Sequence, residues 1–275
     1  MGKARWLQEQ RRDEVEDYLS RDNVILLPTG TVEQHGLHLP LMTDAAQAIA
    51  LAEAVSEKTG IMIAPPIWYG WTPHHMSYKG STTLRPETLA ALVEDVCLSL
   101  IHHGFDRIFV ISGHRSMNYV PMEPAINRVR FQTGAYVALI DIIQIARLEL
   151  SEIVECEVGE MGHACELETS VMLAIRPDLV DMKKAKKGIR VHQEQLMQRL
   201  IISDPRVNAN RFSFYPTADE FAVSTRESDG MHGNPTKASA DKGKRILDAQ
   251  VQNTLKAIEI SRKAKIKVFN RPIPV

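Results

Sequence analysis

Acidic and histidine side chains are concentrated in one short stretch, "GTVEQHGLHLPLMTDA" at 30–45. Glu33 and His35 follow the apolar run "VILLP" and lie two residues apart, so in an extended loop both side chains point to the same side. Asp44 opens the next amphipathic segment, where the free N–H groups and the dipole of a helix favour a carboxylate. Taken alone, these three residues fit a helix cap with an ion pair as well as a metal site.

Two later motifs add the same residue types. His114 follows another apolar run in "ISGHRSMN", and "GHACELETS" carries His163, Glu166 and Glu168. On a helix that starts near this second motif, His163 and Glu166 are three residues apart and would share a face. Acids and a histidine beside a buried helix are costly unless something compensates them, which favours a bound cation.

Three carboxylates and two imidazoles from these motifs form a candidate set of metal ligands: Glu33, His35, Asp44, His114 and Glu168. Mixed nitrogen and oxygen ligands suit zinc, manganese or iron(II) better than calcium or magnesium, and zinc is our first choice among them. A catalytic zinc ion normally takes three protein ligands, so five predict two divalent ions that share a carboxylate. Two such ions with three carboxylates and one hydroxide would be nearly neutral, as a hydrolase requires.

The elements that must position these residues follow from the hydrophobic pattern. Short apolar runs predict strands at 24–28, 61–65, 107–112 and 135–140. Longer amphipathic segments predict helices at 44–60, 86–104, 119–131, 141–157, 165–175 and about 236–264. The polar stretch 203–235 predicts mostly loop, with a short strand at 219–224.

The alternation of strands and helices predicts an α/β fold, a three-layer α/β/α sandwich around a mostly parallel central sheet. Ligands of such sheets bind at the carboxyl ends of the strands, which is where Glu33, His35 and His114 fall. We find no linker or composition break, so we expect one domain over 1–275.

The composition argues against several other classes of protein. The chain is 44% hydrophobic and 24% charged with a formal net charge of -1, and no basic stripe predicts a nucleic-acid partner. No run approaches the roughly 18 apolar residues of a membrane span. The three cysteines are widely spaced and odd in number, which favours a reducing cytoplasm over a disulfide framework.

The motifs resemble those of the creatininase (creatinine amidohydrolase) family. The resemblance runs through "LPTGTVEQHGLHLPLMTD", "SGH", "GHACELETSVMLAIRPDLV" and, more weakly, "DGMHGNPTKASADKGKRIL". It implies a three-layer α/β fold, a dinuclear metal centre, a small-molecule substrate and a homo-oligomer, either a hexamer or another multiple of a dimer. It also implies that Glu33, Asp44 and His114 hold one metal, and that His35, Asp44 and Glu168 hold the other with Asp44 bridging.

The resemblance also implies roles for residues around the metals. His163 matches a position near the scissile bond and would shuttle a proton, and Glu166 matches a glutamate that many members share. The segment 69–89 matches one near the site, where Trp71, His75 and Tyr78 would line a substrate pocket. The chain departs from creatininase after His114: no glutamate stands two residues on, and Arg115 would meet a polar substrate or pair with a neighbouring acid.

The resulting expectation is a dinuclear metal-dependent hydrolase in which metal-bound hydroxide attacks the carbonyl of a small cyclic amide or related C–N substrate. The missing glutamate weakens the expectation of creatinine itself. One alternative is a ring-opening hydrolase that cleaves a C–C bond in a cyclic diketone, such as an oxidised inositol of the 3-dehydro-scyllo-inosose type. A second alternative is a catalytically inactive structural or binding subunit, which the intact ligand set argues against.

Overall fold

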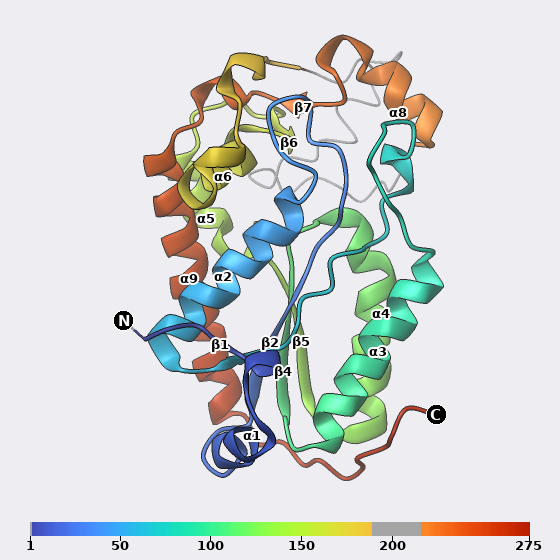
Figure 1. The fold of residues 1–275 in the computed structure, drawn as a ribbon, viewed down its shortest axis with the longest axis vertical. Helices are drawn as coiled ribbons and strands as arrows, with labels where there is room; N and C mark the ends of the chain where they lie inside the picture. The colour runs from blue at the N-terminus through green and yellow to red at the C-terminus, as the bar shows by residue number, and fades with distance from the viewer. Residues whose placement is uncertain (1, 189–215) are drawn as a thin grey trace.

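A five-stranded parallel sheet forms the centre of the molecule in the computed structural model, which describes residues 2–188 and 216–275 (Figure 1). The strands lie in the order β1-β3-β2-β4-β5, and every neighbouring pair is parallel. Their bounds are β1 Arg5–Trp6, β2 Val24–Thr29, β3 Met62–Ile63, β4 Arg107–Ser112 and β5 Tyr136–Asp141. The parallel sheet predicted from the apolar runs is therefore confirmed.

Helices cover both faces of the sheet, so the three-layer α/β/α prediction is also confirmed. One face carries α2 Thr43–Thr59, α5 Arg147–Ile153, α6 Glu166–Ile175 and α9 Ala240–Lys263. The other carries α3 Pro86–His102 and α4 Ser116–Thr133, with α1 Arg12–Leu19 near the amino ends of the strands. Near the carboxyl ends lie α8 Ala218–Ser224 and the antiparallel pair β6 Met161–His163 and β7 His232–Gly233.

Burial on both faces explains the continuous apolar run of β2. Successive side chains of a strand point to opposite faces, so Val24 and Leu26 pack with α2 and α9, while Ile25 and Leu27 pack with α3 and α4. All four side chains are fully buried. The strand that ends just before the candidate ligands is thus fixed by two hydrophobic cores, one on each side.

Two predicted elements differ from the structure. The segment at 219–224 is helix α8 rather than a strand, because Thr217 and Glu220 form a capping box that starts a helix there. The predicted helix 141–157 is reduced to α5 and a 3-10 turn, since β5 continues to Asp141. The remaining predicted helices occur within a few residues of their expected bounds, and 203–215 lies outside the described residues.

Candidate metal centre

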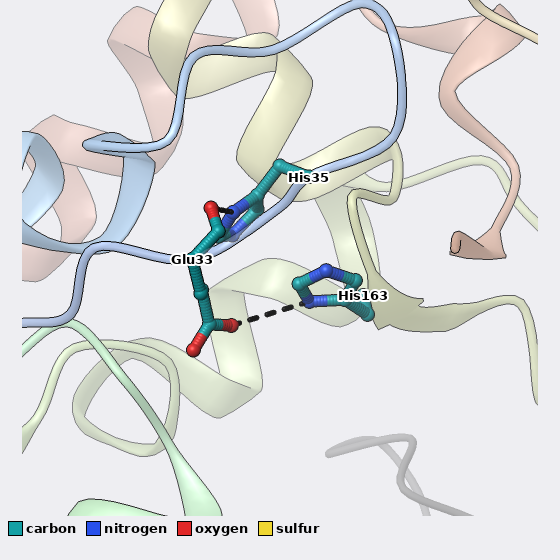
Figure 2. Close-up of side chains that lie close together, drawn as sticks. All are labelled: Glu33, His35 and His163. Atoms are coloured by element: carbon teal, nitrogen blue, oxygen red, sulfur yellow. Dashed lines mark hydrogen bonds and ion pairs between the residues drawn. The ribbon is translucent and has the colours of Figure 1, made fainter. Parts of the chain in front are cut away.

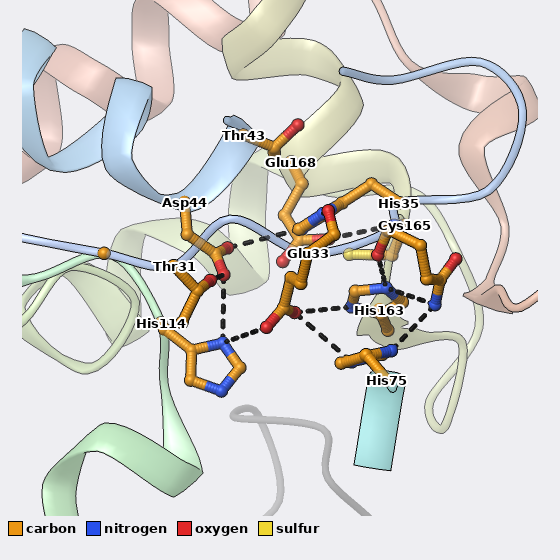
Figure 3. Close-up of polar contacts among 12 residues, drawn as sticks. Thr31, Glu33, His35, Thr43, Asp44, His75, His114, His163, Cys165 and Glu168 are labelled. Atoms are coloured by element: carbon orange, nitrogen blue, oxygen red, sulfur yellow. Dashed lines mark hydrogen bonds and ion pairs between the residues drawn. The ribbon is translucent and has the colours of Figure 1, made fainter. Parts of the chain in front are cut away.

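Four separate elements bring the five predicted metal ligands together at the carboxyl end of the sheet. Glu33 and His35 lie in the loop after β2, Asp44 in the first turn of α2, His114 directly after β4, and Glu168 in the first turn of α6 (Figure 3). All five side chains are buried. The arrangement is the one expected of a parallel sheet, in which loops from neighbouring strands meet at one edge.

Asp44 lies between two groups of potential ligand atoms. Its Oδ2 is 2.9 Å from Nδ1 of His114, and its Oδ1 is 3.3 Å from Nε2 of His35. One group combines Asp44 with Glu33 and His114, and the other combines it with His35 and Glu168. Within each group the candidate ligand atoms lie within 4.8 Å of one another. The two carboxylate oxygens of Asp44 thus face different groups, as a bridging ligand requires.

The hydrogen bonding of these side chains supports a cation-binding site. Among the residues that the structure describes, neither carboxylate oxygen of Glu33 has a hydrogen-bond partner, although both atoms are buried. Nε2 of His35 and Nε2 of His114 are also buried and have no hydrogen-bond partner among the described residues. Buried polar atoms without hydrogen bonds are costly, and a divalent ion would satisfy several of them at once. The nitrogen and oxygen donors fit two ions of the zinc, manganese or iron class.

Without an ion, the ligands compensate one another through unusual protonation. Burial disfavours the imidazolium form of His35, but Asp44, Glu168 and Glu33 outweigh it and raise its pKa to about 10. For His114, burial likewise lowers the pKa, but Glu33 and Asp44 outweigh it and raise the pKa to about 9. Burial raises the pKa of Glu168 to about 7. In the absence of metal ions, His35 and His114 are therefore protonated near neutral pH.

His163 joins the same cluster from strand β6. Its Nδ1 lies 3.7 Å from Oε1 of Glu33, and its ring centroid is 4.3 Å from that of His35 (Figure 2). Glu33, His35 and His163 also form a third group that could hold an ion. Burial, reinforced by the neighbouring His35, keeps the pKa of His163 well below its usual range, so the ring is neutral.

Glu166 does not join this cluster, in contrast to the expectation that it shares a helix face with His163. Helix α6 begins at Glu166 itself, and Ala164 adopts a left-handed φ of 54° between the strand and the helix. Two residues apart on that helix, Glu166 and Glu168 point to different sides. The Glu166 carboxylate instead accepts hydrogen bonds from the backbone N–H of Cys156 at 2.7 Å and from Nζ of Lys242 at 2.5 Å.

Of the predicted substrate-binding residues, His75 lies against the candidate ligands. Its Nε2 is 3.2 Å from Oε1 of Glu33 and its side chain is buried. Tyr78 lies further from the cluster, where its hydroxyl meets Oγ1 of Thr225 at 2.9 Å. Phe221 of α8 packs edge-on against His75, with 4.5 Å between the ring centroids. The loop after β3 and helix α8 therefore form one wall beside Glu33.

Trp71 and Arg115 take other positions. Trp71 packs at the edge of the hydrophobic core below α3 and α4, and its backbone N–H donates to Oδ1 of Asn118. Nε of Arg115 lies 3.9 Å from Oδ2 of Asp141, so the pairing with a neighbouring acid is the arrangement observed. Arg115 and Asp141 line a cavity of about 600 Å³ that runs along β5 and is otherwise mostly apolar.

Two residues of the centre were not predicted from the sequence. Oγ1 of Thr31 donates to Oδ2 of Asp44, which fixes that oxygen on the side of His114. Gln34 contacts His75 and His163 at once, with its side-chain nitrogen 2.8 Å from Nδ1 of His75. The position of Gln34 between Glu33 and His35 was the available signal, since a buried amide among ligands needs partners of its own.

Histidine and carboxylate groups gathered at the carboxyl edge of a parallel α/β sheet form a site that could hold divalent metal ions, as in metal-dependent enzymes. The sequence model described as "Creatininase: Creatinine amidohydrolase" matches residues 8–258, and the chain belongs to this family. The family resemblance seen in the motifs and the expectation of an enzyme are both confirmed.

Similarity to characterised relatives extends over most of the chain. It is 28% identical over 253 residues to a creatinine amidohydrolase of Pseudomonas putida, covering 86% of this chain and 89% of that one. It is 28% identical over 246 residues to a mycofactocin precursor peptide peptidase of Mycobacterium ulcerans, covering 85% and 84%. It is 27% identical over 185 residues to a 3-dehydro-scyllo-inosose hydrolase of Thermotoga maritima, covering 66% and 59%.

The fold agrees with that of solved creatininases. One creatinine amidohydrolase structure superposes with a TM-score of 0.79 at 23% identity, covering 96% of this chain and 100% of the other. Two further creatininase structures are described as a "Zn-Zn type" and as "Creatininase Mn". Members of this family thus carry zinc or manganese. No helix in the described part of this chain is long and apolar enough to cross a membrane.

Proposed function

We propose that this chain is a dinuclear metal-dependent hydrolase that cleaves a C–N bond of a small cyclic amide or related substrate. The observation that carries the proposal is Asp44, whose two oxygens face two groups of buried ligand atoms. Glu33, Asp44 and His114 would hold one ion, and His35, Asp44 and Glu168 the other. Zinc is our first choice, with manganese or iron as alternatives.

Bound divalent ions supply Lewis acidity, which lowers the pKa of water and polarises a carbonyl oxygen. The chain's own residues hold the carboxylates in place and limit the access of bulk water, because all five candidate ligands are buried. His163 is neutral, and its Nδ1 is directed to the side of Glu33. It can accept a proton from the attacking water and return it to the departing nitrogen.

The names of the relatives support the C–N bond as the first choice. Two of the three are a creatinine amidohydrolase and a peptidase, and both break C–N bonds. The inosose hydrolase supports the alternative, a C–C cleavage in a cyclic diketone, over a smaller share of the chain. The absence of a glutamate two residues after His114 keeps this alternative open. The resemblance further supports a homo-oligomer, and the three free cysteines support a cytoplasmic location.

Metal analysis tests the centre directly. We expect about two divalent ions per chain in protein purified without chelators, and loss of both in Asp44→Asn, because Asp44 serves both groups. Asp141→Asn is the matched control: this aspartate is the last residue of β5, beside β4, but its carboxylate accepts the backbone N–H groups of Ile143 and Gln144 instead. Near-zero metal in the wild type that added zinc, manganese or iron cannot restore would rule out the centre.

A substrate panel separates the two bond types once metal is established. Cyclic amides, formamides and short peptides are compared with cyclic polyol ketones, and both amine release and acid release are measured. Amine release that depends on the bound metal supports the proposed activity. Acid release alone, from the ketones only, would assign the C–C alternative. No turnover of either class by the metal-loaded protein would favour an inactive binding subunit.

A further inference from the structure

Gln34 makes more contacts with the centre than any assigned role explains. The residue is buried between two candidate ligands, and its side-chain nitrogen lies near three possible partners. These are Nδ1 of His75 at 2.8 Å, Nε2 of His163 at 3.1 Å and the carbonyl oxygen of Gly230 at 2.8 Å. An amide nitrogen carries only two hydrogens, so one of the three contacts cannot be a hydrogen bond from Gln34.

The orientation of the Gln34 amide is fixed by groups that cannot change their roles. Its Oε1 accepts the backbone N–H of Gly36 at 2.9 Å, and its Nε2 donates to the carbonyl of Gly230. Exchanging the two atoms would set an N–H against an N–H and an oxygen against an oxygen. One hydrogen therefore goes to Gly230, and a single hydrogen is left for the two histidines.

The backbone carbonyl of Gln34 decides which histidine receives that hydrogen. Nε2 of His163 lies 2.6 Å from this oxygen, which can only accept, so His163 carries its proton on Nε2 and donates it there. The remaining hydrogen of the Gln34 amide is then donated to Nδ1 of His75. An imidazole that accepts at Nδ1 cannot be charged, and its proton must lie on Nε2.

We propose that Gln34 is a positioning residue that holds His75 and His163 in the same tautomer but presents opposite groups of the two rings to the metal centre. His75 faces Oε1 of Glu33 with Nε2, which carries a proton, at 3.2 Å. His163 faces the same oxygen with Nδ1, which carries a lone pair, at 3.7 Å. One ring therefore acts as a donor and the other as a proton acceptor.

This division of roles deepens the proposed function and rests on it for its catalytic meaning. The protonated Nε2 of His75 faces Oε1 of Glu33, while Oε2 of Glu33 lies 3.4 Å from Nδ1 of His114, on the side of the first ligand group. The lone pair of His163 is left available to take a proton. Residues that orient metal ligands in this way typically contribute about 10- to 100-fold to metal affinity or activity.

Nitrogen-15 NMR of the histidine rings tests the proposal without an activity assay. Protein labelled at histidine is recorded in long-range proton–nitrogen spectra, both chelated and zinc-loaded, with His75→Gln and His163→Gln used to assign the signals. We expect the proton on Nε2 of both rings in the chelated wild type. A proton on Nδ1 of His75 would overturn the proposal, whether or not metal binds, so this result is independent of the proposed hydrolase.

The substitution Gln34→Glu supplies a sharper test within one spectrum. A carboxylate offers no hydrogen to Nδ1 of His75, so the proton should move to that nitrogen, while the backbone carbonyl that holds His163 is unchanged. The expected result is a changed His75 and an unchanged His163, with about 10- to 100-fold weaker zinc binding. Two unchanged rings would refute a positioning role.

Gln250→Glu is the matched control for burying a carboxylate. Gln250 is equally buried and donates to the backbone carbonyl of Ile142, away from the metal centre. It should lose stability but keep both tautomers and its zinc affinity. If the Gln34 variant does not fold, the wild-type spectrum alone decides the question.

Discussion

At the scale of single residues, the protonation of the candidate ligands links the stability of the protein to pH. His35 and His114 have folded-state pKa values of about 10 and about 9, above the ordinary value of 6.5. A raised histidine pKa contributes stability that is fully present below pH 6.5 and is lost as the pH rises to the folded values. A bound divalent ion replaces these protons, so this pH dependence belongs to the metal-free protein only.

We therefore expect the chelated protein to lose thermal stability steadily between pH 6.5 and pH 10. The zinc-loaded protein should lose much less over the same range. Calorimetric melting temperatures of both forms, measured at several pH values, check this. Parallel curves for the two forms would mean that these histidines are not ligands.

For Glu166, an experiment can distinguish a structural role from a role as proton donor. Its buried carboxylate pairs with Lys242, and removal of one partner from a buried pair typically costs about 3–5 kcal/mol. We expect Glu166→Gln to lower the free energy of unfolding, measured by urea denaturation, while the metal content stays at the wild-type level. Loss of turnover without loss of stability would instead restore Glu166 as the proton donor.

At the scale of elements, the first turn of α6 is held in place by close packing against α9. A Cβ atom at Gly243 would lie within 1.9 Å of the carbonyl oxygen of Ser170, so only glycine allows the two helices to approach this closely. Because α6 also carries Glu168, the packing between these helices positions one of the candidate ligands.

Gly243→Ala should consequently destabilise the protein by about 1–3 kcal/mol, since the clash outweighs the gain of about 1 kcal/mol in helix propensity. Urea denaturation measures the change. Lys244→Ala, at the neighbouring exposed position of α9, should stay within about 0.5 kcal/mol of the wild type. An unchanged or higher stability of Gly243→Ala would contradict the packing described.

The sequence predicted the elements with strong periodicity and left out those that depend on tertiary contacts. The run "VILLP" identified β2 because both of its faces are buried, whereas α8 was missed because its amphipathic pattern covers only two turns. The five candidate metal ligands, which the structure brings together, were predicted from residue types and their positions beside the apolar runs. The direction of Glu166 was not, since it depends on the residue at which α6 begins.

At the scale of the whole molecule, the three cysteines are all free and buried. Burial raises the pKa of the Cys97 thiol to about 12, so little thiolate exists there near neutral pH. We expect Ellman's reagent to react with none of the thiols of the native protein at pH 8 within minutes, and with all three in denaturant. Rapid reaction of the native protein would show that the cores open far more readily than their packing indicates.

The order of the ligands along the chain has a consequence for synthesis. Glu33, Asp44 and His114 all lie in the first half of the chain, and the pairing of β2 with β4 brings the segments that carry Glu33 and His114 together. The second group needs Glu168, which reaches the sheet only after a further 54 residues, counted from 114 to 168. On the ribosome, the residues of the first candidate group are therefore all synthesised before Glu168, so the two groups become complete one after the other.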